Sequence, residues 1–391
     1  MNKPVEPRRS RRIFARASDL SSAVSVRSFA LLGAAAFVAA GAYAANRADI
    51  SPMVYVRTVA VAPAQPLWPL PLDKVAYNKR MLALAHYVAP PSPIPGATST
   101  KPVAMPQWTA TTSVSIPGAL WPKATVYPQG GALLPFKRIV AYYGNFYSTK
   151  MGVLGEYSPA VVLAKLASTT EMWAKADPTT PTIPAIQYIA VVAQGQPGPD
   201  GKWRARMPDS QIQKALDMAN QIHGLLILDV QVGQSTLEQE LPPLEKWLKL
   251  PNVELGIDPE FSMKYGNAPG TVIGTFNAGD VNYAASFLAT IVKENHLAPK
   301  VLIVHRFTYD MVTGVSDIRP LPQVEVVMDM DGWGEPARKF NTYKRIIEPY
   351  PVQFTGMKLF YHADLKPPST RMLTPQEVLS LTPTPIYIQY Q

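Results

Sequence analysis

From residue 136 to the end of the chain, short apolar runs rich in β-branched and aromatic residues alternate with longer segments of helical spacing. We expect eight strands, which begin at Arg138, Thr182, Leu225, Val253, Lys300, Val324, Thr355 and Pro385. The helical spacing predicts helices over 158–176, 210–223, 235–250, 278–296, 335–348 and 374–381. Only the segment between the fifth and sixth strands, 309–323, is short for a helix.

This alternation of strand and helix predicts an α/β fold of the (β/α)8 barrel type. Residues 136–391 amount to 256 residues, and such barrels usually have about 250. A doubly wound open sheet is the alternative. It is less favoured because no glycine-rich dinucleotide loop follows the first strand.

The fourth strand shows where polar side chains would meet in such a barrel. Its apolar residues Val253, Leu255 and Ile257 share one parity, whereas Asp258 and Glu260 share the other. Alternate residues of a barrel strand face the helices or the barrel axis, and residues at the strand carboxyl ends form the site. We therefore expect the apolar set to face the helices and both carboxylates to point into the barrel mouth.

The same pattern recurs at the ends of the other strands. The side chains expected at this mouth are Asp229, Gln231, His305, Asp329, Asp331, Lys358, Gln389 and Gln391, with Tyr143, Asn145 and Gln187 assigned from geometry alone. Clustered carboxylates repel one another unless cations or water compensate, and we expect His305, Arg306 and Lys358 to do so. The alternative is that polar residues simply mark where each strand leaves the core.

Several kinds of chemistry are excluded by the residues present. The chain has no cysteine and no Gly-x-Ser-x-Gly motif, and its five histidines form no i, i+4 pair. A divalent cation held by Asp and Glu oxygens stays open, and no other cofactor is expected. Glycoside hydrolysis needs only two carboxyl groups. Aromatic residues expected near the rim could stack on sugars: Tyr142, Tyr143, Phe146, Trp333, Phe360 and Tyr361.

Two functions from different classes therefore remain. The first is a carbohydrate-active hydrolase with Asp258 and Asp331 as the paired carboxyls, acting on a polysaccharide of the cell envelope or matrix. The supporting residues would be Asp229, Glu260, His305 and Asp329. The second is a non-catalytic envelope protein that uses an inactive barrel for binding or structure.

The amino-terminal segment has the layout of an export signal. Residues 1–27 carry seven Lys and Arg and two acidic residues, which is +5 of the chain's net charge of +9, so the body is not basic enough to indicate a nucleic-acid partner. An uncharged run over 28–45 ends in Ala-Tyr-Ala. Residues 1–45 are thus predicted to be a signal peptide, by the general or the twin-arginine route, or an uncleaved anchor that is the chain's only membrane contact. The body is expected in the periplasm or outside the cell.

Residues 46–135 differ in composition from the barrel. They contain 15 prolines, which disfavour helix interiors and central strands. This stretch is predicted to be a linker or an arm that wraps the body. One segment, 71–88, has helical spacing and is expected to form a single docked helix.

Six separated blocks carry a family resemblance. They are YYGNFYSTKMGVLGEYSP, DVQVGQSTLEQELPPL, IDPEFSM, VHRFTYDMV, DMDGWGEP and FTGMKLFYH, followed by a terminal YQ. In this order they resemble a family of exported, mostly uncharacterised bacterial proteins. The resemblance covers about residues 137–391. It implies a (β/α)8 barrel and export, and it implies no particular activity.

Overall fold

A closed barrel of eight parallel strands forms the centre of the protein, and this confirms the predicted fold. The computed structural model describes residues 69–89 and 104–391; the expected export signal over 1–45 lies outside them. The barrel strands are β1 (Arg138–Gly144), β2 (Thr182–Ala193), β4 (Leu225–Val230), β5 (Val253–Ile257), β7 (Lys300–Arg306), β9 (Val324–Met330), β10 (Phe354–Leu359) and β11 (Tyr387–Tyr390). Pairing of β1 with both β2 and β11 closes the ring.

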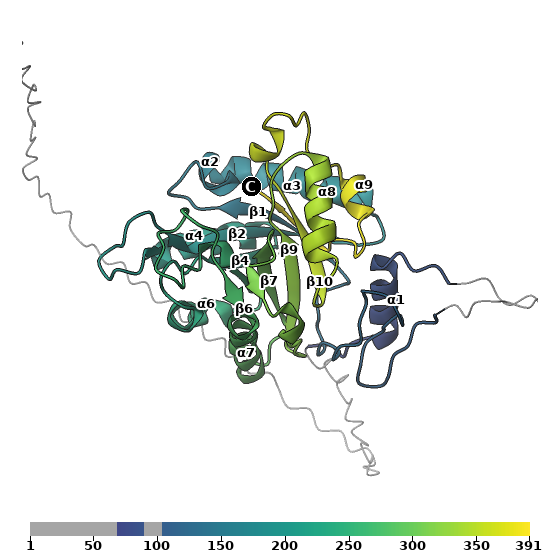
Figure 1. The fold of residues 1–391 in the computed structure, drawn as a ribbon. Helices are drawn as coiled ribbons and strands as arrows, with labels where there is room; N and C mark the ends of the chain where they lie inside the picture. The colour runs from purple at the N-terminus through teal and green to yellow at the C-terminus, as the bar shows by residue number, and fades with distance from the viewer. Residues whose placement is uncertain (1–68, 90–103) are drawn as a thin grey trace, which may run out of the picture. The chain divides into compact units, whose positions relative to one another are not determined.

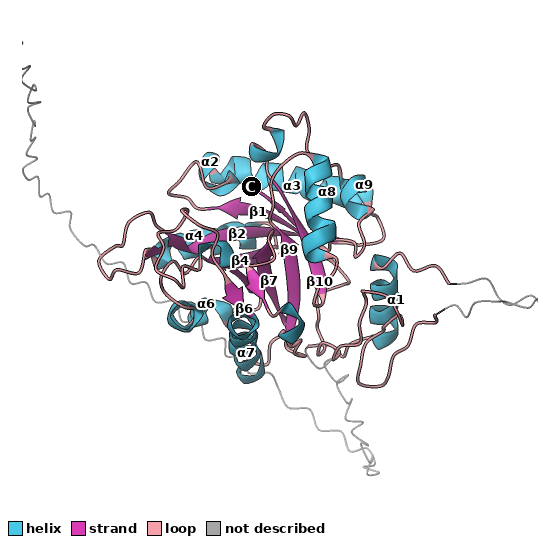
Figure 2. Ribbon diagram, viewed as in Figure 1, coloured by secondary structure: helices cyan, strands magenta, loops and turns pink. Residues whose placement is uncertain are grey.

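Helices surround these strands (Figure 2). They are α2 (Val153–Glu156), α3 (Pro159–Ala176), α4 (Asp209–Gln221), α5 (Leu237–Glu240), α6 (Glu245–Leu248), α7 (Ala278–Glu294), α8 (Pro336–Thr342) and α9 (Pro375–Leu379). Short 3-10 turns are η1 (Pro242–Leu244), η2 (Pro259–Phe261), η3 (Val315–Asp317) and η5 (Ala363–Leu365), and a π-helical turn, η4 (Tyr343–Ile347), continues α8. Three short strands, each of two or three residues, lie outside the barrel: β3 (Arg204–Arg206), β6 (Phe276–Asn277) and β8 (Val312–Thr313).

One of the expected helices is interrupted in the structure. The segment predicted as one helix over 235–250 is divided into α5, η1 and α6. Pro242 and Pro243 lie at the division, where they remove two backbone N–H donors. Between β7 and β9 the chain forms only β8 and η3, so this gap has no α-helix, as its short length suggested.

Strand parity sorts the core into an outer and an inner layer. Val253, Leu255 and Ile257 belong to the outer cluster that packs against the helices. The inner cluster contains alternate residues of other strands, such as Ile303 and Val327. Each of these side chains is completely buried, which stabilises the fold by about 1.5–3 kcal/mol per large apolar residue. The predicted direction of the β5 side chains is confirmed.

The described part of the proline-rich segment packs against the amino-terminal end of the barrel. It contains α1 (Lys74–Leu84), which lies beside the lower part of β10 in Figure 1. The arm residues Tyr77, Trp121 and Leu134 join the inner cluster of the barrel. The backbone N–H groups of Leu133 and Leu134 donate to the Glu325 carboxyl, at 3.0 Å each. These contacts make the segment a wrapping arm over its described residues.

No helix among residues 69–89 and 104–391 is both long and apolar enough to cross a membrane. The predicted apolar run at 28–45 is not part of these ranges.

Candidate functional site at the barrel mouth

A cavity of about 280 Å³ opens at the carboxyl ends of the strands. Its polar lining consists of Tyr143, Lys150, Gln231, Asp258, Glu260, Asp331, Lys358 and Gln391, and its apolar lining includes Ile189, Phe261, Phe307, Trp333 and Phe360. This combination of apolar walls and a few convergent polar groups is typical of small-molecule sites. The cavity is where the parity argument predicted a site.

Beneath this cavity, the imidazole ring of His305 is completely buried among three aspartates. Its Nε2 lies 3.1 Å from Asp229 Oδ1, and its Nδ1 lies 3.0 Å from Asp329 Oδ2 and 3.4 Å from Asp331 Oδ2. Burial alone would lower the pKa of His305, but the charge and hydrogen bond of Asp229 and the hydrogen bond of Asp329 raise it well above the usual value. An imidazolium can donate from both nitrogens, so His305 serves as a buried cation.

Both carboxylate oxygens of Asp229 accept hydrogen bonds from neighbouring side chains. Burial raises the pKa of Asp229, but the charge and hydrogen bond of His305 outweigh this effect and hold it below the usual value. Gln187 donates to its Oδ1 at 2.9 Å, and the Tyr143 hydroxyl donates to its Oδ2 at 3.1 Å. Asp229 does not line the cavity, so it supports His305 from below.

Two glycines make room for this buried layer. A Cβ atom at Gly256 would overlap Oδ1 of Asp229, and one at Gly356 would lie 2.6 Å from Oδ1 of Asp329. Burial raises the pKa of Asp329, while the hydrogen bond and charge of His305 oppose the rise. Oδ1 of Asp329 has no hydrogen-bond partner within the described part of the chain.

Asp331 lies between two cations. Lys358 Nζ is 3.0 Å from its Oδ1, and His305 Nδ1 is 3.4 Å from its Oδ2. Burial would lower the pKa of Lys358, but the charges of Asp331 and Asp258 raise it above the usual value. The Lys358 ammonium also lies 4.1 Å from the centre of the Tyr143 ring, a favourable cation–π position. Asp331 therefore has a basic side chain within 3.5 Å of each of its oxygens.

Asp258 and Glu260 lie in an environment that raises their pKa values. Burial raises the pKa of Asp258 well above its usual value, and although the charge of His305 opposes this, the charges of Glu260 and Asp331 add to it. Burial, followed by the charge of Asp331, raises the pKa of Glu260 to about 7. Gln231 Nε2 donates to Asp258 Oδ2 at 3.3 Å, and the Glu260 N–H donates to Asp258 Oδ1 at 3.1 Å. Both carboxyl groups therefore bind a proton more readily than an ordinary carboxylate, and Glu260 titrates near neutral pH.

Three carboxyls could together hold a divalent cation. One oxygen each of Asp258, Glu260 and Asp331 lies within 4.8 Å of the others, and carboxylate oxygens are the ligands that Ca²⁺ and Mg²⁺ prefer. The Lys358 ammonium pairs with Asp331, and burial raises the pKa values of the other two carboxyls.

Besides Gln187, Asp229, His305 and Asp329, which lie beneath the cavity, three more of the predicted site residues do not line it. The expectation that Arg306 compensates the cluster is wrong, because its parity places it on the outer face of β7. There its Nη1 donates to the Ile346 carbonyl at 3.2 Å and its Nη2 to the Tyr309 carbonyl at 3.3 Å. Asn145 instead ties β1 to β2 by donating to the Ile189 carbonyl at 3.0 Å. Gln389 lies in the buried layer and donates to the Tyr387 hydroxyl at 2.8 Å.

Some of the aromatic residues expected near the rim line the cavity and others do not. Of the six expected near the rim, Tyr143, Trp333 and Phe360 line the cavity. Tyr142 and Tyr361 contact each other through their hydroxyls at 2.9 Å, away from it. Phe146 stacks on Tyr188 with ring centres 4.8 Å apart. The lining residues that the sequence did not indicate are Lys150, Met151, Ile189, Ala193, Phe261 and Phe307. Phe261 directly follows the predicted fourth strand and Phe307 is the last residue of the predicted fifth strand, which is the signal that could have identified them.

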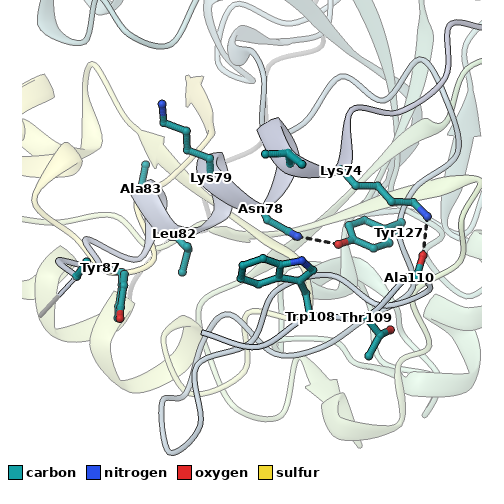
Figure 3. A pocket seen from close by; sticks show the side chains of 12 residues that line it. Lys74, Asn78, Lys79, Leu82, Ala83, Tyr87, Trp108, Thr109, Ala110 and Tyr127 are labelled. Atoms are coloured by element: carbon teal, nitrogen blue, oxygen red, sulfur yellow. Dashed lines mark hydrogen bonds between the residues drawn. The ribbon is translucent and has the colours of Figure 1, made fainter. Parts of the chain in front are cut away.

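A larger cavity, of about 800 Å³, lies in the arm and not in the barrel mouth (Figure 3). It is bounded by α1 on one side and by Trp108 and Thr109 on the other. Asn78 donates to the Tyr127 hydroxyl at 2.7 Å and Lys74 donates to the Ala110 carbonyl at 2.5 Å across its floor. Among the residues that the structure describes, no carboxyl group lines this cavity.

Comparison with protein-family models and with curated proteins finds no match to this chain. The family resemblance of the six sequence blocks therefore stays a prediction.

Proposed function

We propose that the protein is a glycoside hydrolase that acts outside the cytoplasm on a polysaccharide of the cell envelope or matrix. The observation that carries the proposal is the contrast between two carboxyls in one cavity. Asp331 is flanked by the cations Lys358 and His305, whereas the pKa of Glu260 is raised to about 7. Two neighbouring carboxyls in such different environments are typical of an acid and a nucleophile.

The geometry favours a double displacement. Retaining glycosidases place their two carboxyls about 5–5.5 Å apart and inverting enzymes about 6.5–9.5 Å apart. Oxygens of Glu260 and Asp331 lie within 4.8 Å of each other. This distance is closer to the carboxyl separation of retaining enzymes than to that of inverting enzymes. This assignment replaces Asp258 of the expected pair by Glu260, because the buried carboxyl of Asp258 is only 2% exposed and is held by Gln231.

In the proposed first step, Asp331 attacks the anomeric carbon while Glu260 gives its proton to the departing glycosidic oxygen. The sugar is then bound covalently to Asp331, and Glu260 is a carboxylate. In the second step Glu260 takes a proton from water, the water oxygen attacks the anomeric carbon, and Asp331 leaves as the free carboxylate. Trp333, 45% exposed, and Phe360 would provide apolar surface for the sugar.

One observation favours a second function. The ion pair between Lys358 and Asp331 holds the proposed nucleophile at 3.0 Å, which would suit a non-catalytic barrel that only binds an envelope glycan. The two functions differ in what they require of Asp331. A binding protein tolerates its neutralisation, whereas a glycosidase of the proposed type does not.

The test is hydrolysis of a panel of aryl glycosides and envelope polysaccharides by the wild type, Asp331→Asn and Glu260→Gln. Asp217→Asn and Glu238→Gln, both on exposed helical surfaces, are the matched controls. We expect activity in the wild type and both controls, with a loss of at least 10²-fold in the two site variants. Equal activity in wild type and Asp331→Asn would exclude the proposed mechanism.

A further inference from the structure

A second cluster of charged residues lies at the opposite end of the barrel, where α1 contacts the loop before β2. A cavity of about 300 Å³ opens between these elements, and its lining includes Arg80, His86, Arg138, Asp177, Thr179 and Thr384. Three of these residues are basic and only one is acidic. The cavity therefore has a positive balance, in contrast to the acidic barrel mouth.

Arg138 is the unusual member of this cluster. It is the first residue of β1 and its side chain is completely buried. Its Nη2 lies 3.0 Å from Asp177 Oδ2, and its Nε donates weakly to the Pro385 carbonyl at 3.4 Å. Its Nη1 has no hydrogen-bond partner within residues 69–89 and 104–391. A buried donor without an acceptor costs free energy, and in native proteins it indicates a water or ion that binds there.

The carboxylate of Asp177 is shared between Arg138, which contacts Oδ2, and Thr179, which contacts Oδ1. Asp177 Oδ1 accepts from the Thr179 backbone N–H at 3.1 Å and from the Thr179 hydroxyl at 2.6 Å. Burial lowers the pKa of Arg138, the charge of Asp177 opposes the change, and the nearby charge of Arg80 adds to it. Two guanidinium groups therefore repel each other beside a carboxylate that cannot balance both.

Arg80 and His86 provide the other side of the cavity. Arg80, on α1, donates to the Thr179 carbonyl, which directs its guanidinium toward the loop that holds Asp177. His86 follows α1 and contacts the Thr384 hydroxyl through Nε2 at 2.7 Å. These groups come from the arm, whereas Arg138 comes from the barrel. A ligand held by both would bridge the arm and the barrel.

We propose that this cavity binds a phosphate group, held by the guanidinium groups of Arg80 and Arg138 with His86 at its entrance. The planar guanidinium matches two oxygens of a phosphate with two parallel N–H donors. A phosphate accepts from Nη1 of Arg138 and compensates the second arginine. The site is independent of the barrel mouth and does not rest on the proposed hydrolase activity.

Titration calorimetry with inorganic phosphate, at constant ionic strength and pH 7.5, tests the proposal on the full chain. We expect saturable binding of one phosphate per chain, and we expect Arg80→Gln to weaken it at least tenfold. His86→Gln is a second variant, at an exposed position, and we expect it to weaken phosphate binding as well. Arg319→Gln is the control, because Arg319 is exposed and does not line the cavity.

The phosphate group could belong to a free ion or to a lipid headgroup, and vesicles separate these sources. Vesicles with phosphatidic acid are compared with vesicles of phosphatidylcholine for the same variants. Binding of inorganic phosphate that depends on Arg80 supports a free ion, and Arg80-dependent binding of phosphatidic acid vesicles alone supports a headgroup. The inference is overturned if the wild type binds neither, or if Arg80→Gln binds either one as tightly as the wild type.

Discussion

The ammonium nitrogen of Lys358 on β10 lies 3.0 Å from Oδ1 of Asp331, which directly follows β9, and both side chains are almost completely buried. This pair gives the proposed nucleophile a cationic partner. Asp258 and Glu260 differ from Asp331 in this respect, because burial raises their pKa values.

Replacing Lys358 by Met should destabilise the protein. Removing one partner of a buried ion pair leaves an uncompensated charge and costs about 3–5 kcal/mol. Urea denaturation measures the free energy of unfolding. Lys175→Met is the matched control, because Lys175 forms an exposed i, i+4 pair with Glu171, and surface pairs of this kind contribute little. An equal effect of both substitutions would contradict the buried pairing.

Asp258→Asn should keep or increase the free energy of unfolding at pH 7. The folded protein raises the pKa of Asp258, so between the unfolded and folded pKa values the native state binds the additional proton and stability falls as pH rises. An amide at this position has no charge to bury. We expect its advantage over the wild type to be largest above pH 7 and to disappear near pH 4.

Denaturation over a pH series measures this difference. Asp217→Asn serves as the exposed control and should follow the wild type at each pH. An Asp258→Asn protein whose disadvantage grows with pH would show instead that the carboxylate of Asp258 is stabilised in the folded state.

The pH dependence of kcat/KM should report on Glu260. Protonated Glu260 is the proposed acid and its pKa is about 7, so activity should decrease as pH rises through that value. In Glu260→Gln this decrease of kcat/KM with rising pH, the alkaline limb of the profile, should be absent. This variant should also lose about 10²–10⁴-fold in rate on substrates with poor leaving groups, and much less on activated aryl glycosides. A limb near pH 7 that persists in Glu260→Gln would assign it to another group.

Tyr77→Ala should show that the arm is part of the folded core. The Tyr77 side chain is completely buried beneath the barrel, and truncating a large aromatic residue in a core costs about 3–5 kcal/mol. Val75→Ala is the control on the same helix, because Val75 is 80% exposed. If both variants unfold at the wild-type urea concentration, the arm does not contribute to the stability of the barrel.

Strand parity made much of the barrel mouth predictable from sequence. The apolar residues of β5 identify its outer face, and the same counting places Asp229, His305 and Lys358 inside. Strict counting of alternate residues would also have excluded Arg306 from the barrel mouth, because Arg306 shares the parity of the outward residues Leu302 and Val304. The error came from grouping residues by charge and not by direction.

Other features depend on tertiary contacts that a sequence pattern does not contain. Phe261 and Phe307 lie beyond the strands, where alternation no longer determines direction, so their place in the cavity wall was not predictable. The raised pKa of Glu260 results from burial and from the charge of Asp331 on another strand. Residues 104–135 form no named helix or strand, as their prolines indicated, but the prolines carried no information about the burial of Trp121 and Tyr127.

Covalent trapping tests the central claim, that Asp331 is the nucleophile of a glycoside hydrolase, most directly. The full chain is incubated with a panel of 2-deoxy-2-fluoro glycosides that carry good leaving groups, because the fluorine slows release of a glycosyl–enzyme intermediate. Mass spectrometry of the digested protein should then find one sugar adduct on Asp331, and none in Asp331→Asn. An adduct on Asp258, or no adduct and no hydrolysis across the panel, would contradict the account.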